Sequence, residues 1–151
     1  MEITAQMVKD LREMSGAGMM DCKKALTEAK GNMDDAVNYL REKGIAKSLK
    51  KESRIAAEGL ANVFIDGNKA VILEVNSETD FVSKNQEFVD MIEEIGVSIM
   101  KSKAKTLEEA KKAETKEGTV EELIISKIAK IGEKLSLRRF TYLEKSDSQV
   151  F

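Results

Sequence analysis

The chain has 151 residues, of which 42% are apolar and 34% are charged, and its 25 basic and 27 acidic side chains leave a net charge of −2. This composition predicts one ordinary domain, or a small domain with a modest one, and the near-neutral charge provides no overall field to attract nucleic acid. The sequence has no histidine and a single cysteine, Cys22; this excludes histidine-based catalytic and metal sites, thiolate metal sites and an internal disulfide, and it fits a reducing cytosol.

Residues 1–44 predict a bundle of three short helices. Thr4 is a natural N-cap for the first helix, and apolar side chains keep helical spacing around it, namely Ile3, Met7, Leu11 and Met14. The stretch SGAG then breaks the helix, because glycine adopts backbone angles that a helix does not use. Asp21 and Asn32 are expected to cap the second and third helices, and Gly44 to follow the third as its C′ glycine. Such a bundle is of the ubiquitin-associated (UBA) type, which usually binds a partner.

Residues 45–58, IAKSLKKESRIAAE, predict a helical linker between the bundle and the rest of the chain. Four basic side chains recur at i, i+3, i+4 and i+7, so they would share one helix face; they are Lys47, Lys50, Lys51 and Arg54. A solvated helix face is the simpler interpretation of this stripe. A patch that binds RNA or an acidic partner is the alternative.

A β-hairpin is predicted next. The runs LANVFI and AVILEVN are rich in strand-forming residues, and DGNK between them is a tight-turn sequence. Both faces of the runs are mainly apolar, which predicts a sheet that is covered on one side and partly on the other.

The stretch SETDFVSKN follows the hairpin and leads into a helix. Ser83 with Gln86 three residues later fits a capping box for that helix. The helix carries an apolar stripe suited to a core, made of Phe88, Met91, Ile92, Ile95 and Ile99. Because Phe88 already supplies an aromatic anchor, the stripe does not need Phe81, although burial remains the default for a large apolar side chain.

Two further helices and a strand complete this part of the chain. Each helix begins with a capping box, Thr106 with Glu109 and Thr119 with Glu122. The second helix is expected to end at Gly132 and to bury four apolar side chains, Leu123, Ile124, Ile128 and Ile131. The polar stretch KKAETKEG is expected to form a mobile loop, and LSLRRFTYLE alternates like a third strand. The order ββααβ predicts that residues 59–151 form an α+β domain, an antiparallel sheet with helices packed on one face.

The chain ends with KSDSQVF, which indicates a polar turn and then the start of another strand at Val150 and Phe151. A strand cut after two residues would leave an unpaired sheet edge and an unfinished core. We therefore expect the chain to be part of a longer protein, truncated at the C-terminus of its second domain. The weakly held edge would also favour self-association.

Several functional segments are not found in the sequence. There is no glycine-rich phosphate loop of the Walker or dinucleotide type, since SGAGMMD has neither spacing. No apolar run approaches the roughly 18 residues of a membrane span, and MEITAQMVKD lacks the charge pattern of a signal peptide. These features favour a binding protein over an enzyme, with no cofactor and no membrane association expected.

Three long stretches resemble the bacterial translation elongation factor Ts family. They are LREMSGAGMMDCKKALTEAKGNMDDAV, VILEVNSETDFVSKN and AKIGEKLSLRR. The resemblance covers nearly the whole chain and implies that the bundle leads into the first half of the family's core. The implied activity is guanine nucleotide exchange on the GTPase elongation factor Tu, in the cytoplasm. The family continues into a second core half with a histidine-bearing contact loop, which this sequence does not contain.

The resemblance also implies two groups of residues that contact elongation factor Tu. The first group surrounds the exchange motif and comprises Thr79, Asp80, Phe81, Val82, Ile131 and Gly132. Within it, Phe81 is implied to wedge into the GTPase domain near the helix that follows the partner's second switch. The second group lies in the bundle and comprises Arg12, Met19, Met20 and Lys23. Without the resemblance, the two methionines would be assigned to the bundle core and the two charged side chains to solvent.

Two alternatives from other functional classes stay open. One is an adaptor, in which a UBA-type bundle is joined to an α+β interaction domain without exchange activity. The other is an RNA-binding protein that uses the Lys47–Arg54 stripe, which would require an affinity that falls steeply with salt.

Overall fold

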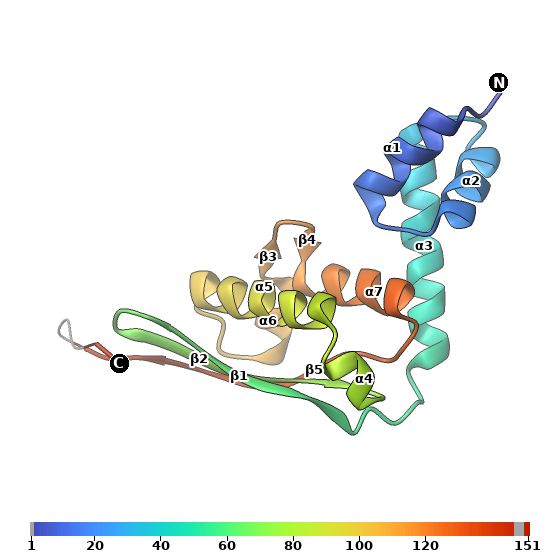
Figure 1. Ribbon diagram of the computed structural model, residues 1–151. Coiled ribbons are helices and arrows are strands. Elements are labelled where there is room, and N and C mark those ends of the chain that lie inside the picture. Colours follow the sequence, from blue (N-terminus) through green and yellow to red (C-terminus); the bar gives the residue numbers. More distant parts are fainter. Residues whose placement is uncertain (1, 147–149) are drawn as a thin grey trace.

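The computed structural model describes residues 2–146 together with 150 and 151, and Figure 1 shows two parts joined by one long helix. The first part is a helical bundle, which stands away from a sheet that carries helices on one side. The bundle is made of α1 (Ala5–Ser15), α2 (Met19–Glu28) and the beginning of α3 (Met33–Lys51). The predicted α+β class with an antiparallel sheet is confirmed. The likeness of the bundle to the UBA type stays a prediction.

Local capping shapes the bundle. The side chains of Thr4 and Asn32 accept backbone N–H bonds at the starts of α1 and α3, so both predicted caps are confirmed. Gly16 ends α1 in the left-handed conformation, with a φ of 65°. The buried core of the bundle is small and consists of Leu11, Cys22, Ala25, Leu26 and Ala36.

One predicted cap of the bundle is wrong, and one apolar position of α1 is exposed. Asp21 does not cap α2, because the helix already begins at Met19 with Gly18 in the cap position. Asp21 instead lies in the first turn, where its negative charge suits the helix dipole. Met14 is exposed, although Leu11 one turn earlier is buried. The reason is its place in the last turn of α1, beside the chain reversal, where the spacing no longer points into the core.

Helix α3 does not end at Gly44 but continues to Lys51, so it takes in half of the predicted linker. Gly44 is buried within the helix, which packs there against α7 (Val120–Ile131). A Cβ atom at this position would lie 3.7 Å from Ile125 and 3.8 Å from Ala129. These are ordinary contact distances, and the boundary predicted at residue 44 lies inside one continuous helix.

The sheet has the strand order β1-β2-β5, and both neighbouring pairs are antiparallel. Its strands are β1 (Glu58–Asp66), β2 (Lys69–Ser77) and β5 (Ser136–Glu144). The first two form the predicted hairpin, and Gly67 in its turn has a φ of 59°. Glycine adopts this backbone conformation without strain, so the turn sequence fixes the hairpin register.

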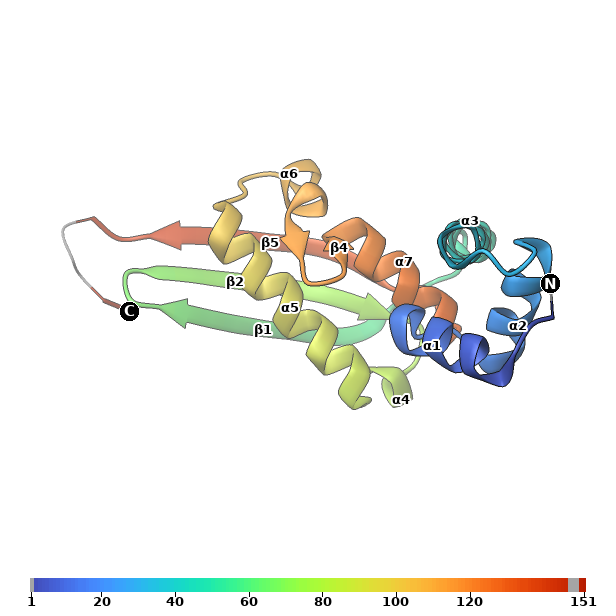
Figure 2. The ribbon, with the colours of Figure 1, turned by 90° about the horizontal axis from the view of Figure 1, so that it is seen from above.

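Helices on one side of the sheet bury its inner face (Figure 2). They are α4 (Asp80–Ser83), α5 (Gln86–Ser102), α6 (Leu107–Lys112) and α7. The apolar stripe predicted for α5 is fully buried and packs with Val71, Leu73 and Val75, which alternate along β2. On α7 three of the four predicted core residues are buried and Ile131 is half-buried.

The caps of this second part are partly as predicted. Thr106 and Thr119 cap α6 and α7 by accepting backbone N–H bonds. Ser83 does not cap α5, because Asn85 occupies the position next to the helix and accepts an N–H bond there. Ser83 is buried instead, and its hydroxyl donates to the backbone carbonyl of Asp80.

The polar stretch KKAETKEG, predicted as a mobile loop, has regular structure. It ends α6 and then forms a hairpin of β3 (Glu114–Thr115) and β4 (Gly118–Thr119). The hydroxyl of Thr115 donates to the carbonyl of Gly118 at 2.7 Å and closes the turn. Strands of two residues are too short to show alternation, so the sequence pattern could not reveal them.

The outer face of the sheet carries several exposed apolar side chains, and no described helix lies over it. It exposes side chains from all three strands, Val63, Ile65, Ile72 and Leu143. The predicted strand at the end of the chain is not formed by Val150 and Phe151, although the Phe151 N–H donates to the Gly67 carbonyl at 3.1 Å. Residues 147–149 of the predicted turn lie outside the described residues. Self-association stays a prediction.

Candidate functional site

Phe81 lies in a four-residue helix that follows β2. Thr79 is the N-cap of this helix, and its hydroxyl accepts the N–H of Val82 at 3.4 Å. Val82 is half-buried against the core and Ser83 is buried. Asp80 and Phe81 are exposed on the same short helix, and the Phe81 side chain is 83% exposed. Burial as the default for Phe81 is therefore wrong, and the prediction that the core does not need this ring is confirmed.

Asp80 is available for a further contact. Its carboxylate lies 3.5 Å from the Nζ of Lys84, and both side chains are largely exposed. An exposed ion pair of this spacing contributes little to stability. The Asp80 carboxylate can therefore exchange Lys84 for another partner at small cost.

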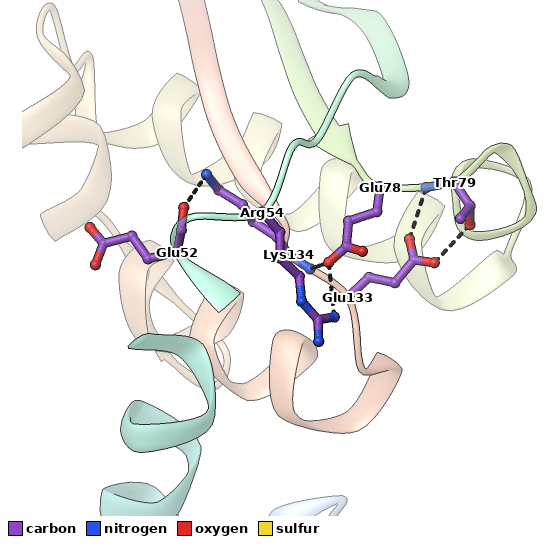
Figure 3. A network of polar contacts seen from close by, with 6 residues as sticks. All are labelled: Glu52, Arg54, Glu78, Thr79, Glu133 and Lys134. Carbon is purple, nitrogen blue, oxygen red and sulfur yellow. Dashed lines mark hydrogen bonds and ion pairs between the residues drawn. The ribbon is translucent and has the colours of Figure 1, made fainter. Parts of the chain in front are cut away.

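The Phe81 corner (residues 79–82) is tied to the loop that follows α7. The Glu133 carboxylate accepts two hydrogen bonds from Thr79, one from the backbone N–H at 3.0 Å and one from the hydroxyl at 2.7 Å (Figure 3). Glu133 directly follows Gly132, which ends α7 with a φ of 87°. The fold thus places Ile131 and Gly132, predicted as a neighbouring contact, at the same junction as the Phe81 corner.

Glu78 also joins the Phe81 corner to the loop that follows α7, and here the glutamate directly precedes the corner and the backbone N–H belongs to the loop. Its Oε1 atom accepts the backbone N–H of Lys134 at 2.7 Å and lies 3.3 Å from the Arg54 guanidinium (Figure 3). The bond from Lys134, with that from Arg54, holds the pKa of Glu78 below its ordinary value against the opposing effect of burial. Glu78 is therefore ionised at neutral pH, which strengthens both contacts.

Lys134 extends the junction to the end of α3. Its Nζ donates to the carbonyl of Glu52 at 2.6 Å, so three chain segments meet in one polar network (Figure 3). Sequence reasoning missed Glu78, Glu133 and Lys134 as parts of this site. All three lie inside the quoted motifs, but each finds its partner more than one element away, and no local pattern indicates such a pairing.

The predicted basic stripe is interrupted. Helix α3 ends at Lys51, so Arg54 lies outside the helix. Lys47 is 3.3 Å from the carboxylate of Asp21. Arg54 is 3.3 Å from that of Glu78. Two of the four basic groups are thus paired with acidic ones, which weakens the field that an RNA backbone would meet.

The second predicted contact group lies on the bundle, away from the Phe81 corner (Figure 1). Arg12 is in the last turn of α1, and Met19, Met20 and Lys23 are on α2. All four are exposed, and Met20 is 76% exposed. The assignment of the two methionines to the bundle core is therefore wrong. Met14 adds a third exposed methionine close in sequence to this turn.

Clusters of metal-ligating side chains and membrane-spanning helices were both sought among the described residues. Within 2–146 and 150–151, no three histidine, cysteine, aspartate or glutamate side chains are grouped so that they could hold a metal ion. No helix in this part of the chain is long and apolar enough to cross a membrane.

A comparison with protein families matches the part of the chain that holds the Phe81 corner. Residues 78–151 match the family model described as Elongation factor TS. The matched segment begins at Glu78 and includes both sides of the Thr79–Glu133 junction, together with α5, α7 and β5. The family takes part in translation elongation. Residues 78–151, just under half of the chain, are therefore similar to the elongation factor Ts family.

Proposed function

We propose that this chain binds elongation factor Tu and accelerates the release of GDP from it, in the cytoplasm, by inserting Phe81 near the partner's nucleotide site. The match of residues 78–151 to the elongation factor Ts family supports this choice of partner. The observation that carries the mode of action is the exposure of Phe81, a large apolar side chain held on a fixed corner and not used by the protein's own core. An exposed ring does not stabilise the free protein, whereas its burial against a partner would stabilise a complex.

The mechanism follows from binding linkage. A GTPase holds GDP through contacts to the phosphates and through Mg²⁺, which bridges them to switch elements. A factor that speeds GDP release must bind the nucleotide-free partner more tightly than the nucleotide-bound one. A rigid aromatic wedge meets this condition if its pocket opens only when a helix near the second switch has moved. That movement disturbs the Mg²⁺ site and loosens the diphosphate.

The chain's own contribution is a set of two contact surfaces. The core contact is formed by Thr79, Asp80, Phe81 and Val82 with Ile131 and Gly132. The bundle contact is formed by Arg12, Met19, Met20 and Lys23. Exposed methionines suit this second surface, because their flexible and polarisable side chains adapt to an apolar partner. The bundle contact would supply affinity, while the wedge would supply the preference for the nucleotide-free state.

The test compares two phenylalanine-to-alanine variants. Phe81→Ala should change the free energy of unfolding by less than about 0.5 kcal/mol, since surface substitutions rarely cost more. It should nevertheless reduce the stimulated rate of GDP release from elongation factor Tu sharply, because the ring's contacts exist in the complex. Phe88→Ala is the matched control: its ring is fully buried, so this change should cost about 3–5 kcal/mol of stability.

Two results would contradict the proposal. Severe destabilisation of the free protein by Phe81→Ala would mean that the ring supports the fold. A wild-type chain that leaves GDP release at its spontaneous rate would leave the adaptor class as the better description.

A further inference from the structure

We propose that Glu133 is a positioning residue for Phe81: it fixes the corner that aims the ring, and it thereby contributes to nucleotide exchange through Thr79. The inference rests on the proposed function, since it assigns a residue to the same site. It adds a group outside the predicted contact residues, from a loop 54 positions away in the sequence from Thr79.

The first argument is the hydrogen bonding of Thr79. Its backbone N–H and its hydroxyl both donate to the Glu133 carboxylate, at 3.0 and 2.7 Å. Because the hydroxyl proton is directed to Glu133, its oxygen lone pairs are left to accept the N–H of Val82, at 3.4 Å. Glu133 therefore orients the group that caps the helix carrying Phe81. Hydrogen bonds to an ionised carboxylate are stronger than those between neutral groups.

The second argument is that this short helix depends on contacts with the rest of the protein. Helix α4 has only four residues, and so short a helix is not stable without outside contacts. Val82 and Ser83 anchor its inner side. On the outer side, the Asp80–Lys84 ion pair is exposed and holds the backbone weakly. At its beginning, two residues before Phe81, Thr79 donates its two hydrogen bonds to Glu133, and its carbonyl accepts one from the Ser77 hydroxyl at 2.9 Å.

The third argument is that Glu133 is itself held firmly. It follows the glycine that ends α7, and the next residue, Lys134, donates its N–H to Glu78 at 2.7 Å. Each segment thus bonds the backbone of the other through a glutamate (Figure 3). Because Glu133 is held next to the end of α7 and bonds Thr79, the position of α7 can determine the position of the Phe81 corner.

The experiment uses the full chain and the release of a fluorescent GDP analogue from elongation factor Tu. Glu133→Gln keeps the size of the side chain but turns an amide NH₂ toward one of the two Thr79 donors. Small misplacements of a positioned group can cost up to about 100-fold in rate, so we expect stimulated release to fall about tenfold. Glu109→Gln is the matched control, because Glu109 also accepts a backbone N–H, that of Lys105 at 2.7 Å, beside a threonine cap. The Glu109→Gln variant should stimulate GDP release from elongation factor Tu as strongly as the wild type does.

A double-mutant cycle separates aiming of the ring from a general structural role. If Glu133 acts through Phe81, Glu133→Gln should cause little further loss in the Phe81→Ala background. The cycle is measured at factor concentrations that keep the release by Phe81→Ala above the spontaneous rate. An equal loss in both backgrounds, or no loss in the wild-type background, would overturn the inference. Full activity of Phe81→Ala alone would instead overturn the proposed function.

Substitutions at Thr79 provide a rescue test. Thr79→Ser keeps both donors to Glu133 and should retain most of the stimulated release. Thr79→Val keeps the shape but loses the hydroxyl, and it should resemble Glu133→Gln. If Thr79→Ser and Thr79→Val stimulated GDP release equally, the hydrogen bond from the Thr79 hydroxyl to Glu133 would have no role in exchange.

Discussion

Gly44 and Gly96 are both helical glycines, but their surroundings predict opposite effects of alanine. At Gly96 a Cβ atom would clash with the ring of Phe64, so Gly96→Ala should lower the free energy of unfolding by about 1–3 kcal/mol. At Gly44 it would make ordinary contacts with Ile125 and Ala129. Alanine forms helix better than glycine by about 1 kcal/mol, so Gly44→Ala should leave stability unchanged or raise it. Urea unfolding of both variants checks these signs, and a large loss at Gly44 would contradict the argument.

Gly44 and the helix caps show which local structures can be predicted from neighbouring residues in the sequence and which cannot. Gly44 follows a helical run and has the spacing of a C′ glycine, yet the helix continues because α7 packs against it. Caps such as Thr4 and Asn32 were predictable, because the bonds that they accept lie within three residues. Where two capping residues lie close together, as with Ser83 and Asn85, the pattern did not show which one the fold selects.

At the scale of elements, the junction of Figure 3 should be sensitive to acid. The pKa of Glu78 is lower in the folded protein than its ordinary value of 4.5, because Lys134 and Arg54 bond its ionised form. Its contribution to stability is therefore present above about pH 4.5 and is lost as the pH falls through the folded pKa. Glu78→Gln should be less stable than the wild type at pH 7, and this difference should shrink toward pH 3.

Urea unfolding at the two pH values measures that difference, and Glu42→Gln is the control. Glu42 is an exposed glutamate of α3, so its variant should follow the wild type at both pH values. A Glu78→Gln variant that differs from the wild type by the same amount at pH 3 and pH 7 would contradict the ionic role of Glu78.

The bundle contact is a second prediction at this scale. Met20 and Lys23 are exposed on α2 and do not belong to the bundle core. Met20→Ala combined with Lys23→Ala should therefore weaken binding to elongation factor Tu while leaving thermal unfolding little changed. Titration calorimetry and a thermal melt measure the two quantities. A large loss of stability with unchanged affinity would show that these side chains support the bundle instead.

Most elements were predictable because apolar spacing is a local property. The stripe of α5 and the alternation of β5 each lie within one run of residues, and both elements form where expected. The site was predictable only in part. The exposure of Phe81 was suggested by the presence of Phe88, whereas the Thr79–Glu133 bonds depend on how α7 is packed over the sheet. Contacts set by packing between distant elements have no signature in either segment alone.

At the scale of the molecule, the bundle and the core are joined in two places. Helix α3 packs against α7 at Gly44, and beyond its end the Glu52 carbonyl and Arg54 bond Lys134 and Glu78. The proposed contacts with elongation factor Tu lie on both parts. Two linked contacts reinforce each other only if the geometry lets both engage at once. The relative placement of bundle and core should therefore control affinity for the partner.

Gly44→Leu tests this placement. A Cβ atom fits at the position, but it already lies 3.7 Å from Ile125 and 3.8 Å from Ala129, so a larger side chain must push α3 away from α7. Helix α3 should still form, because leucine is a good helix former. We expect the factor concentration that gives half-maximal GDP release to rise, with a smaller change in the maximal rate, since Phe81 keeps its own corner. Gly44→Ala is the matched control and should behave like the wild type. If Gly44→Leu loosens the α3–α7 contact, as seen by faster amide exchange in α7, yet leaves this concentration unchanged, then the two parts do not engage the partner together.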